Sequence, residues 1–370
     1  MADSKVNIGI VGCGNISPAY LKTAQAMKVL ETAACADLYA DRARAIAEQF
    51  GVPKACTVDE LIADPEVRIV VNLTTPQAHA EISLRAIDAG KHVYNEKPLA
   101  VTREDGKMIL DAAKAKNVRV GCAPGTFIGG GLQTCRKLLD DGAIGRVVAC
   151  SAFMMCHGHE SWHPDPAYYY KEGAGPMFDM GPYYLTALTT LLGPITRITG
   201  CSGIAIPERV ITSQPKHGEK ITVQTPDHVT GCFEFKSGAI GVIITSFAVW
   251  GAQLPRIELY GTEGTMSVPD PNSLGGPIRI KRPGAQEWEE VELTHGHAAR
   301  DKWGIGVADM AHAILSGRPH RATGEQAFHV LDVMHGFLDA SRTGKHHTPI
   351  SSMTRPAPVP LGLAEDTLDD

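Results

Sequence analysis

Lys97 is the first residue whose type and position suggest chemistry. It follows the apolar run 92–95 in the segment Glu96-Lys97-Pro98, so we expect it at the carboxyl end of a buried strand, where open α/β sheets bind ligands. In a cleft with little water the ammonium form of a lysine is disfavoured, and the side chain can share a proton with an alcohol. The position therefore predicts a catalytic and substrate-binding lysine, with a solvated loop cation as the alternative.

A second group of residues predicts a dinucleotide site. An apolar run from Val6 leads into Gly12 and Gly14, and a helix is expected over 18–30. Strand, glycine turn and helix in this order direct backbone amides and a helix N-terminus at a pyrophosphate. A side chain at either glycine would hold the phosphates off the backbone. Ser17 replaces the third glycine of the usual fingerprint, so the motif needs support from its context. The residues predicted at the pyrophosphate are Gly12, Gly14, Asn15 and Ile16.

Asp37 provides that context. It lies near the end of a second apolar run, 31–38, and 23 residues after Gly14. That is close to the offset of roughly 20 expected for a carboxylate that binds the ribose hydroxyls. A carboxylate repels a 2′-phosphate, which favours NAD over NADP, although Arg42 is near enough to bear on that choice. The alternative is a buried βαβ unit with an ordinary surface aspartate. The other predicted cofactor residues follow later strands: Thr74, Thr75, Pro76, His79, Glu96 and Lys97.

Strands and helices alternate through the first 122 residues. After the run from Val6, strands are expected over 31–38, 67–74, 92–95 and 119–122, and helices over 18–30, 40–50, 58–62, 77–89 and 103–116. This alternation is typical of a doubly wound parallel sheet. It predicts a Rossmann dinucleotide-binding domain over residues 1–123.

The pattern changes after Ala123. Glycines at 125 and 129–131 predict a loop and domain boundary, and a helix is expected over 132–141. Strand patterns follow at 147–155, 195–202, 210–212, 221–224, 228–235, 239–248, 256–261, 265–269 and 278–281, with helices at 306–316 and 324–343. We therefore expect an α+β substrate-binding and oligomerisation domain over 124–353, on a large, mostly antiparallel open sheet. The proline-rich, then acidic tail 354–370 is expected to be extended and partly loose.

Composition limits the class of protein. The 370 residues suffice for two domains, 44% are hydrophobic, and no run is long and apolar enough to span a bilayer. Without a recognisable leader, the expected location is the cytoplasm. The net charge of −6 is interspersed, which argues against nucleic acid as a partner. The nine cysteines contain no C-x-x-C pair, so we interpret them as reduced, with Cys13, Cys35, Cys122 and Cys150 buried.

The stretch 156–170 is dense in His, Trp and Tyr. A metal site is one interpretation, but the histidines lack the i, i+4 spacing of a helical zinc site. Sugars offer apolar ring faces and hydroxyl edges that Trp, Tyr and His can both contact. We therefore predict no metal and interpret the stretch as a substrate wall, with Trp162 and His163 foremost.

Several motifs occur in a shared order along nearly the whole chain. They are G-C-G-N-I-S at 12–17, E-K-P-L-A at 96–100, D-G-A-I-G-R-V at 141–147, G-A-G-P-M-F-D-M-G-P-Y-Y at 173–184, Y-G-T-E-G-T at 260–265 and G-R-P-H-R-A at 317–322. Together they resemble the glucose-fructose oxidoreductase/inositol dehydrogenase/MocA family. The resemblance implies NAD(P)-dependent sugar or polyol dehydrogenases and reductases, with a Rossmann domain and an open α/β domain whose sheet commonly forms the subunit interface. It also implies a homodimer or homotetramer.

The resemblance assigns roles to three residues. Lys97 corresponds to the family lysine that stands beside the nicotinamide and hydrogen-bonds the reacting hydroxyl. Asp179 and Gly181 match the motif D-x-G-x-H, in which the aspartate helps to orient the substrate, but Tyr183 replaces the catalytic histidine. Some sugar reductases of the family use tyrosine there, so we predict Tyr183 as proton relay, with its pKa lowered by Lys97. The alternative is that Tyr183 only packs and Lys97 alone moves the proton.

These observations predict an NAD-dependent oxidoreductase that moves a hydride between a carbinol carbon of a sugar or cyclic polyol and nicotinamide. One alternative is a hydrolase or lyase that retains its NAD and oxidises a sugar transiently. Another is a dinucleotide-binding regulator without turnover, which the altered D-x-G-x-Y motif permits. Lys97 argues against a regulator, because a sensor has little use for an ammonium group beside the nicotinamide. The predicted partners are a small-molecule substrate and further copies of the chain, without nucleic acid or membrane.

Overall fold

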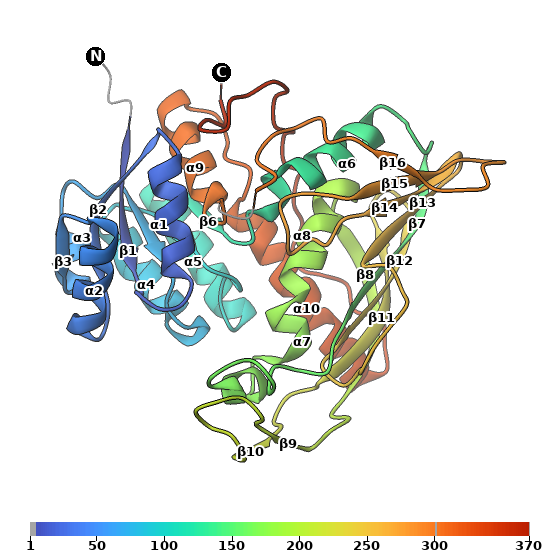
Figure 1. Cartoon of the computed structure of the whole chain (residues 1–370), viewed down its shortest axis with the longest axis horizontal. Coiled ribbons are helices and arrows are strands. Elements are labelled where there is room, and N and C mark those ends of the chain that lie inside the picture. Colours follow the sequence, from blue (N-terminus) through green and yellow to red (C-terminus); the bar gives the residue numbers. More distant parts are fainter. Residues whose placement is uncertain (1–4, 300–301, 370) are drawn as a thin grey trace.

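The computed structural model describes residues 5–299 and 302–369, and its two large sheets are joined by helices (Figure 1). The first sheet, called the parallel sheet below, has the strand order β3-β2-β1-β4-β5-β6. All neighbours in it are parallel, which confirms the predicted doubly wound Rossmann arrangement. Its strands are β1 (Val6–Val11), β2 (Leu30–Ala36), β3 (Lys54–Cys56), β4 (Ile69–Asn72), β5 (His92–Asn95) and β6 (Val120–Cys122). Its helices are α1 (Ser17–Ala26), α2 (Ala40–Phe50), α3 (Val58–Ala63), α4 (Pro76–Asp88) and α5 (Arg103–Lys116).

The second sheet, called the large sheet, has eight strands in the order β16-β15-β14-β13-β7-β12-β11-β8. Its pairs are antiparallel except β12 with β7, which agrees with the predicted mostly antiparallel sheet. Its strands are β7 (Val147–Met155), β8 (Ile195–Gly203), β11 (His228–Phe235), β12 (Ile240–Ser246), β13 (Ile257–Gly261), β14 (Gly264–Val268), β15 (Ile278–Lys281) and β16 (Glu289–Val291). A separate hairpin pairs β9 (Glu208–Val210) with β10 (Lys220–Thr222).

Helices cover one face of the large sheet. Helix α10 (Gly324–Thr343) packs on β8, α8 (Gly181–Leu192) on β7 and α6 (Gly130–Asp140) on β14. Helix α10 also contacts α5, and α9 (Ile305–Ser316) contacts β6, so the last two helices tie the large sheet to the parallel sheet. Figure 1 shows α8 and α10 in the middle of the molecule between the sheets. The remaining elements are α7 (Gly175–Asp179) and the short 3₁₀ helices η1 (Thr126–Ile128) and η2 (Pro166–Tyr170).

The structure corrects several predicted boundaries. Helix α1 ends at Ala26 instead of residue 30, because Leu30 pairs with Val6 as the first residue of β2. Helix α6 begins at Gly130, where a loop was expected. The glycines there serve close packing, since a Cβ on Gly131 would lie 2.1 Å from the Gly275 carbonyl oxygen. Helix α8 was not predicted: it is buried on nearly every side, so its sequence carries no polar stripe of helical period.

The tail after residue 353 has no helix or strand, but it is not loose as expected. Leu368 is fully buried, and the backbone N–H of Val359 donates to Oε1 of Gln133 at 2.8 Å. Glu365 forms an ion pair with the buried Lys302. The tail is therefore docked over its described length, although Asp370 lies outside the described residues.

Two further predictions concern cysteines and membranes. Cys13, Cys35, Cys122 and Cys150 are buried as predicted, and all nine cysteines are free thiols. No helix among the described residues is long and apolar enough to cross a membrane.

Candidate active site

Lys97 joins the two sheets. It follows β5 of the parallel sheet, and its Nζ donates hydrogen bonds to the backbone oxygen of Asp179 at 2.6 Å and to Oδ1 of Asp179 at 2.8 Å. Asp179 ends α7, directly before the helix α8 that packs on the large sheet. An ammonium group has three N–H donors, so two of them are committed to Asp179. The third is left for another acceptor, and the described residues offer no hydrogen bond to it.

The charge of Lys97 differs from the expectation. Burial by itself lowers the pKa of Lys97, as predicted, but the negative charge of Asp179 and the neighbouring Tyr183 and Glu96 raise its pKa above the ordinary value. Burial would likewise raise the pKa of Asp179, yet Lys97 and His159 lower it to about 2. The pair is therefore an ammonium–carboxylate pair at neutral pH, and the expectation of a disfavoured ammonium is wrong for this state of the chain. That expectation took account of burial but not of the charge of the carboxylate partner, Asp179.

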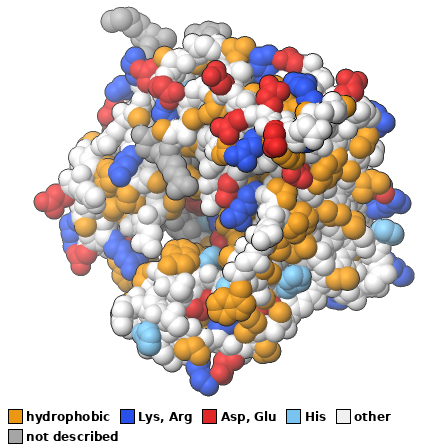
Figure 2. All heavy atoms as spheres, turned by 45° about the vertical axis from the view of Figure 1, so that its right-hand side comes forward, with side chains coloured by type: hydrophobic (Ala, Val, Ile, Leu, Met, Phe, Trp, Pro, Cys, Tyr) orange, Lys and Arg blue, Asp and Glu red, His pale blue; other side chains and the backbone are white. Residues whose placement is uncertain are grey.

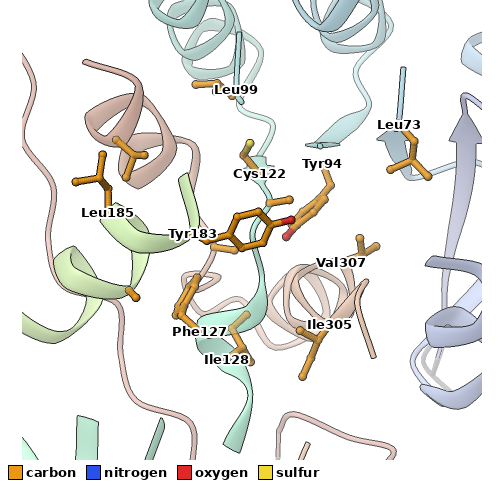
Figure 3. Close-up of a cluster of buried hydrophobic side chains, with 14 of the residues drawn as sticks. Leu73, Tyr94, Leu99, Cys122, Phe127, Ile128, Tyr183, Leu185, Ile305 and Val307 are labelled. Carbon is orange, nitrogen blue, oxygen red and sulfur yellow. The ribbon is translucent and has the colours of Figure 1, made fainter. Parts of the chain in front are cut away.

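Tyr183 extends from α8 into the space beside Lys97. The ammonium nitrogen lies 5.3 Å from the centre of the Tyr183 ring. Figure 3 shows this ring among buried side chains, with its hydroxyl directed toward the side where Tyr94 of β5 lies. No described residue forms a hydrogen bond with that hydroxyl, and it is not among the fully buried polar atoms without a partner, in contrast to the Tyr94 hydroxyl. Burial raises the pKa of Tyr183, and Lys97 offsets only part of this rise. The predicted lowering is therefore wrong, and Tyr183 is a neutral phenol.

His159 belongs to the same cluster, although the sequence did not single it out. Its Nε2 lies 3.3 Å from Oδ2 of Asp179, so one carboxylate bridges a lysine and a histidine. The one sequence signal at His159 is its place in the H-G-H-E segment of the aromatic stretch, for which Trp162 and His163 were the predicted residues. Sequence offers no way to choose among three nearby histidines before their directions are known.

The two residues predicted as a substrate wall lie beside this cluster. The ring of Trp162 lies edge-on to both His159 and His163, with centroid separations of 5.2 and 5.3 Å. Trp162 is 61% exposed, whereas His163 is partly buried. The structure thus brings the two predicted wall residues together with His159 and Asp179. Among the described residues, no group of three or more His, Cys, Asp or Glu side chains is arranged to hold a metal ion.

The glycine turn between β1 and α1 has the form that a pyrophosphate needs. Gly12 has a φ of +99°, and a Cβ on it would lie 2.7 Å from the Leu73 carbonyl, so this glycine is required by the chain itself. A Cβ on Gly14 would meet no atom within 4 Å, which leaves open space over the turn. Helix α1 has no side-chain cap, but its amides of Ser17 and Ala19 donate to the carbonyl oxygens of Gly14 and Ile16 at 3.1 and 3.0 Å, and Pro18 has no N–H. Contact with an anion therefore falls to the amides of the turn 14–16 that precedes the helix. Asn15 is exposed and Ile16 partly exposed in the same turn.

Asp37 lies beside this turn, as predicted. Its Oδ2 accepts the backbone N–H of Cys13 at 2.8 Å, and its Oδ1 accepts that of Tyr39 at 2.9 Å. Each carboxylate oxygen retains a lone pair for a ribose hydroxyl. Arg42 stacks over the Tyr39 ring at 4.6 Å and is exposed. The residues present therefore fit NAD, with the turn at the pyrophosphate and Asp37 at the ribose.

The later predicted cofactor residues divide into two groups. Thr74, Thr75 and Pro76 form the partly open turn between β4 and α4. His79 is fully buried below that turn, and its ring nitrogens contact the carbonyl oxygens of Pro98 and Thr74 at 2.7 and 3.1 Å. A residue without exposed surface cannot touch a dinucleotide, so His79 instead positions the two turns. Glu96 is nearly buried and accepts the Tyr20 hydroxyl at 2.6 Å.

The comparisons with known proteins agree with this geometry. Residues 6–123 match an oxidoreductase family with an NAD-binding Rossmann fold, and residues 132–267 match the GFO/IDH/MocA C-terminal domain. The fold and the dinucleotide turn thus define an NAD-binding oxidoreductase. The chain belongs to the Gfo/Idh/MocA family, which confirms the resemblance of its motifs.

Several relatives act on sugars. Levoglucosan dehydrogenase of Pseudarthrobacter phenanthrenivorans is 27% identical over 288 residues, which cover 70% of this chain and 73% of that protein. The 1,5-anhydro-D-fructose reductase of Ensifer adhaerens is 29% identical over 262 residues, covering 70% and 74%. A solved structure of levoglucosan dehydrogenase in complex with NADH matches with a TM-score of 0.82 and 21% identity, over 94% of this chain and 100% of that chain. At this identity the structural match supports the fold.

Proposed function

We propose that this oxidoreductase transfers a hydride between nicotinamide and a carbinol or carbonyl carbon of a sugar or cyclic polyol. The observation that carries the proposal is the pair of hydrogen bonds from Lys97 to Asp179, which holds an ammonium group where the two sheets meet. The names of the relatives, a levoglucosan dehydrogenase and an anhydrofructose reductase, support a carbohydrate substrate. Residues 1–123 would form the cofactor domain and 124–353 the substrate domain.

Each residue near Lys97 then has a chemical task. The uncommitted N–H of Lys97 donates to the reacting oxygen and stabilises an alkoxide, while Asp179 keeps the lysine charged and directed. The neutral phenol of Tyr183 donates a proton to that oxygen during reduction. The partly open wall of Trp162 and His163 contacts the sugar ring. When bound, NAD supplies the hydride acceptor, and the turn at Gly12 and Gly14, together with Asp37, holds it.

The open face of the large sheet supports a homo-oligomer. Ile240 and Val242 of β12 are exposed, and Val242 pairs with the exposed Cys232 of β11. Figure 2 shows hydrophobic side chains gathered across the right-hand part of the surface, the side on which Figure 1 shows the large sheet. Exposed apolar surface of this kind marks an interaction site, and the proposed occupant is a second copy of the chain.

The test is NADH formation from NAD across aldoses, inositols, anhydrosugars and glycosides, with the reverse reaction on the matching ketones. We expect at least one of these classes to be turned over, and Tyr183→Phe to lose on the order of 10²-fold in rate with that substrate. Equal turnover by parent and Tyr183→Phe would assign the tyrosine to packing. Tightly retained NAD without net NADH from any substrate would contradict the proposal and favour transient oxidation by a hydrolase or lyase.

A further inference from the structure

An exposed hairpin lies beside the two residues predicted as a substrate wall. Strands β9 and β10 each bury only their middle residue, Arg209 and Ile221, and leave the others exposed. An isolated two-stranded hairpin is marginally stable in water, so this one depends on contacts with the rest of the chain. Figure 1 shows it at the lower end of the molecule, below α7. Several of its contacts are with residues 157–163, called the wall loop below, which carry Trp162 and His163.

We propose that Arg209 positions the wall loop beside Asp179 and thereby determines which sugars the enzyme binds. The inference rests on the proposed function, in which Trp162 and His163 contact the sugar ring. Arg209 is a positioning residue in this scheme, because its side chain is only 3% exposed and acts through the wall loop.

The guanidinium group of Arg209 joins the wall loop to the large sheet. Its Nη1 donates to Oε1 of Glu160 at 2.9 Å and to the backbone oxygen of His157 at 3.4 Å, both in the wall loop. Its Nη2 donates to Oδ2 of Asp227 at 2.9 Å and to the backbone oxygen of Phe247 at 2.8 Å. Asp227 directly precedes β11 and Phe247 directly follows β12, so the sheet fixes both of these acceptors. A planar guanidinium group with five N–H donors can bridge two carboxylates in this way.

The bridge places one cation between two carboxylates in a buried position. Asp227 has no exposed surface, and Glu160 is buried. Asp227 also accepts the backbone N–H groups of Ala205 and Ile206 at 2.6 and 3.2 Å, which fixes its carboxylate from the other side. Moving Glu160 away from the guanidinium group would leave a buried charge without its partner, which is unfavourable. The wall loop is therefore held in one position at Glu160.

The backbone of the hairpin holds the same loop. The N–H groups of Thr212 and Ser213, in the turn after β9, donate to the backbone oxygen of Glu160 at 3.0 and 2.9 Å. Oγ of Ser213 donates to the backbone oxygen of His163 at 2.5 Å. The anchored positions 160 and 163 lie on either side of Trp162, so the hairpin fixes the segment that carries this side chain.

The wall loop reaches the catalytic pair through His159. Nε2 of His159 lies 3.3 Å from Oδ2 of Asp179, and its ring packs edge-on against Phe247 at 4.6 Å. Trp162 lies edge-on to the same imidazole and is exposed. A sugar held between Asp179 and Trp162 would thus contact groups whose separation depends on the Arg209 bridge. A displacement of about 1 Å in such a site can cost on the order of 10²-fold in rate.

The first experiment compares Glu160→Gln and Arg209→Lys with the parent. Glutamine removes the charge of Glu160, and lysine keeps the cation but lacks the planar fork that bridges both carboxylates. We expect KM for the best sugar to rise by about 10-fold or more and kcat to change by less than about 3-fold. The relative kcat/KM of sugars that differ in one hydroxyl should change. NADH affinity should stay at the parental value, because the cofactor turn belongs to the parallel sheet.

The matched control is Glu208→Gln on the same hairpin, because Glu208 pairs with Lys220 at 2.8 Å and both side chains are exposed. Thermal unfolding shows whether each variant is folded. If the buried variants do not fold, Ser213→Ala removes only the hydroxyl bond to His163 and should raise KM by a smaller factor. Parental KM and sugar preference in the folded variants would overturn the proposal, as would a rise in KM that Glu208→Gln shares. A fall in kcat at unchanged KM would also overturn it.

A second experiment needs neither substrate nor cofactor. With fluorotryptophan incorporated, the fluorine signal of Trp162 can be followed by NMR of the free protein and assigned with Trp162→Phe. We expect Glu160→Gln and Arg209→Lys to move this signal and to leave that of Trp288, which directly precedes β16, unchanged. An unmoved Trp162 signal would overturn the positioning role, even if the protein proves to be a dehydrogenase. A moved signal with no turnover of any sugar would instead retain the positioning of the wall loop and contradict the proposed function.

Discussion

Burial of the charged side chain of Lys97 or of Asp179 alone would be unfavourable in free energy. Each charge offsets the unfavourable burial of the other. Burial disfavours both charges, yet the pKa of Lys97 is raised and that of Asp179 is lowered to about 2, because the two side chains are 2.8 Å apart. Breaking one member of a buried pair leaves an uncompensated charge. The contact that we propose for catalysis therefore also couples the two sheets.

This charge pair predicts how stability depends on pH. The pKa of Asp179, about 2 in the folded chain, is below the ordinary value of about 3.9. Its stabilisation is therefore complete above about pH 5 and is lost as pH falls toward about 2. Asp179→Asn should lower the free energy of unfolding by on the order of 2 kcal/mol at neutral pH, and the difference should shrink below about pH 4.

Urea unfolding across this pH range tests the prediction. The matched control is Asp165→Asn, because Asp165 is a largely exposed partner of Lys216 and such pairs contribute little. A difference between parent and Asp179→Asn that stays constant down to low pH would show that the carboxylate does not contribute through its charge.

The residues of the site were only partly predictable. Lys97 was predicted from its place at the end of a strand, and Asp179 from the resemblance of its motif to the family pattern D-x-G-x-H. Their mutual contact does not follow, since it spans 82 residues and joins different sheets. His79 and His159 show the same limit: one was expected at the cofactor and is buried, and the other was passed over and contacts Asp179. In both cases the direction of the side chain, which the sequence does not give, determines what the histidine contacts.

At the element scale, the two glycines between β1 and α1, Gly12 and Gly14, have different structural roles. Gly12 has a left-handed φ and no space for a Cβ beside Leu73, whereas Gly14 has open space around it. The chain itself needs the first glycine, and the second leaves space that a ligand can use. Sequence treats the two alike, because both belong to the same motif.

Alanine substitutions at Gly12 and Gly14 should separate these two roles. Gly12→Ala should destabilise the protein by about 2–4 kcal/mol, from the strained φ and the clash with the Leu73 carbonyl. Gly14→Ala should change stability by less than about 1 kcal/mol and weaken NADH binding by at least about 10-fold, since its methyl group enters the space proposed for the phosphates. Thermal unfolding and NADH fluorescence titration give the two readouts. Equal loss of stability in both variants, or unchanged NADH affinity in Gly14→Ala, would contradict this division.

The elements were predictable where their pattern was strong. Helices α2 and α5 and strands β5, β7, β11 and β15 lie where the sequence predicts them, because apolar spacing and ends such as Gly51 coincide. Strands β3 and β16 have three residues each, too few to show a period. Helix α8 is long enough to show a period but was not predicted, because it is apolar nearly all round and has no polar stripe.

At the scale of the whole molecule, the large sheet is covered by helices on one face and open on the other. Strand β12 alternates between the two, with Gly241 and Ile243 buried and Ile240 and Val242 exposed. We expect Val242→Glu to shift the protein toward the monomer. In a symmetric interface on this face, each subunit would bury a glutamate charge, and burial of an unpaired charge is unfavourable. Light scattering after size exclusion measures the molar mass.

A control for this experiment lies on the other side of the molecule. Met108 of α5 is also exposed but belongs to the parallel sheet's helical layer, so Met108→Glu should leave the molar mass unchanged. A parent that is monomeric, or an equal effect of both substitutions, would contradict the assignment of the open face to self-association.

The central claim is that Lys97, where the two sheets meet, binds the reacting oxygen through its uncommitted N–H while Tyr183 moves the proton. The most direct measurement is kcat for Lys97→Ala and Lys97→Arg with the best sugar substrate. We expect a loss of about 10²–10⁴-fold in both, because alanine has no donor and the planar guanidinium group of arginine does not take the place of a compact ammonium group. Parental turnover in Lys97→Arg would reduce Lys97 to a fixed charge, and parental turnover in Lys97→Ala would remove it from the reaction.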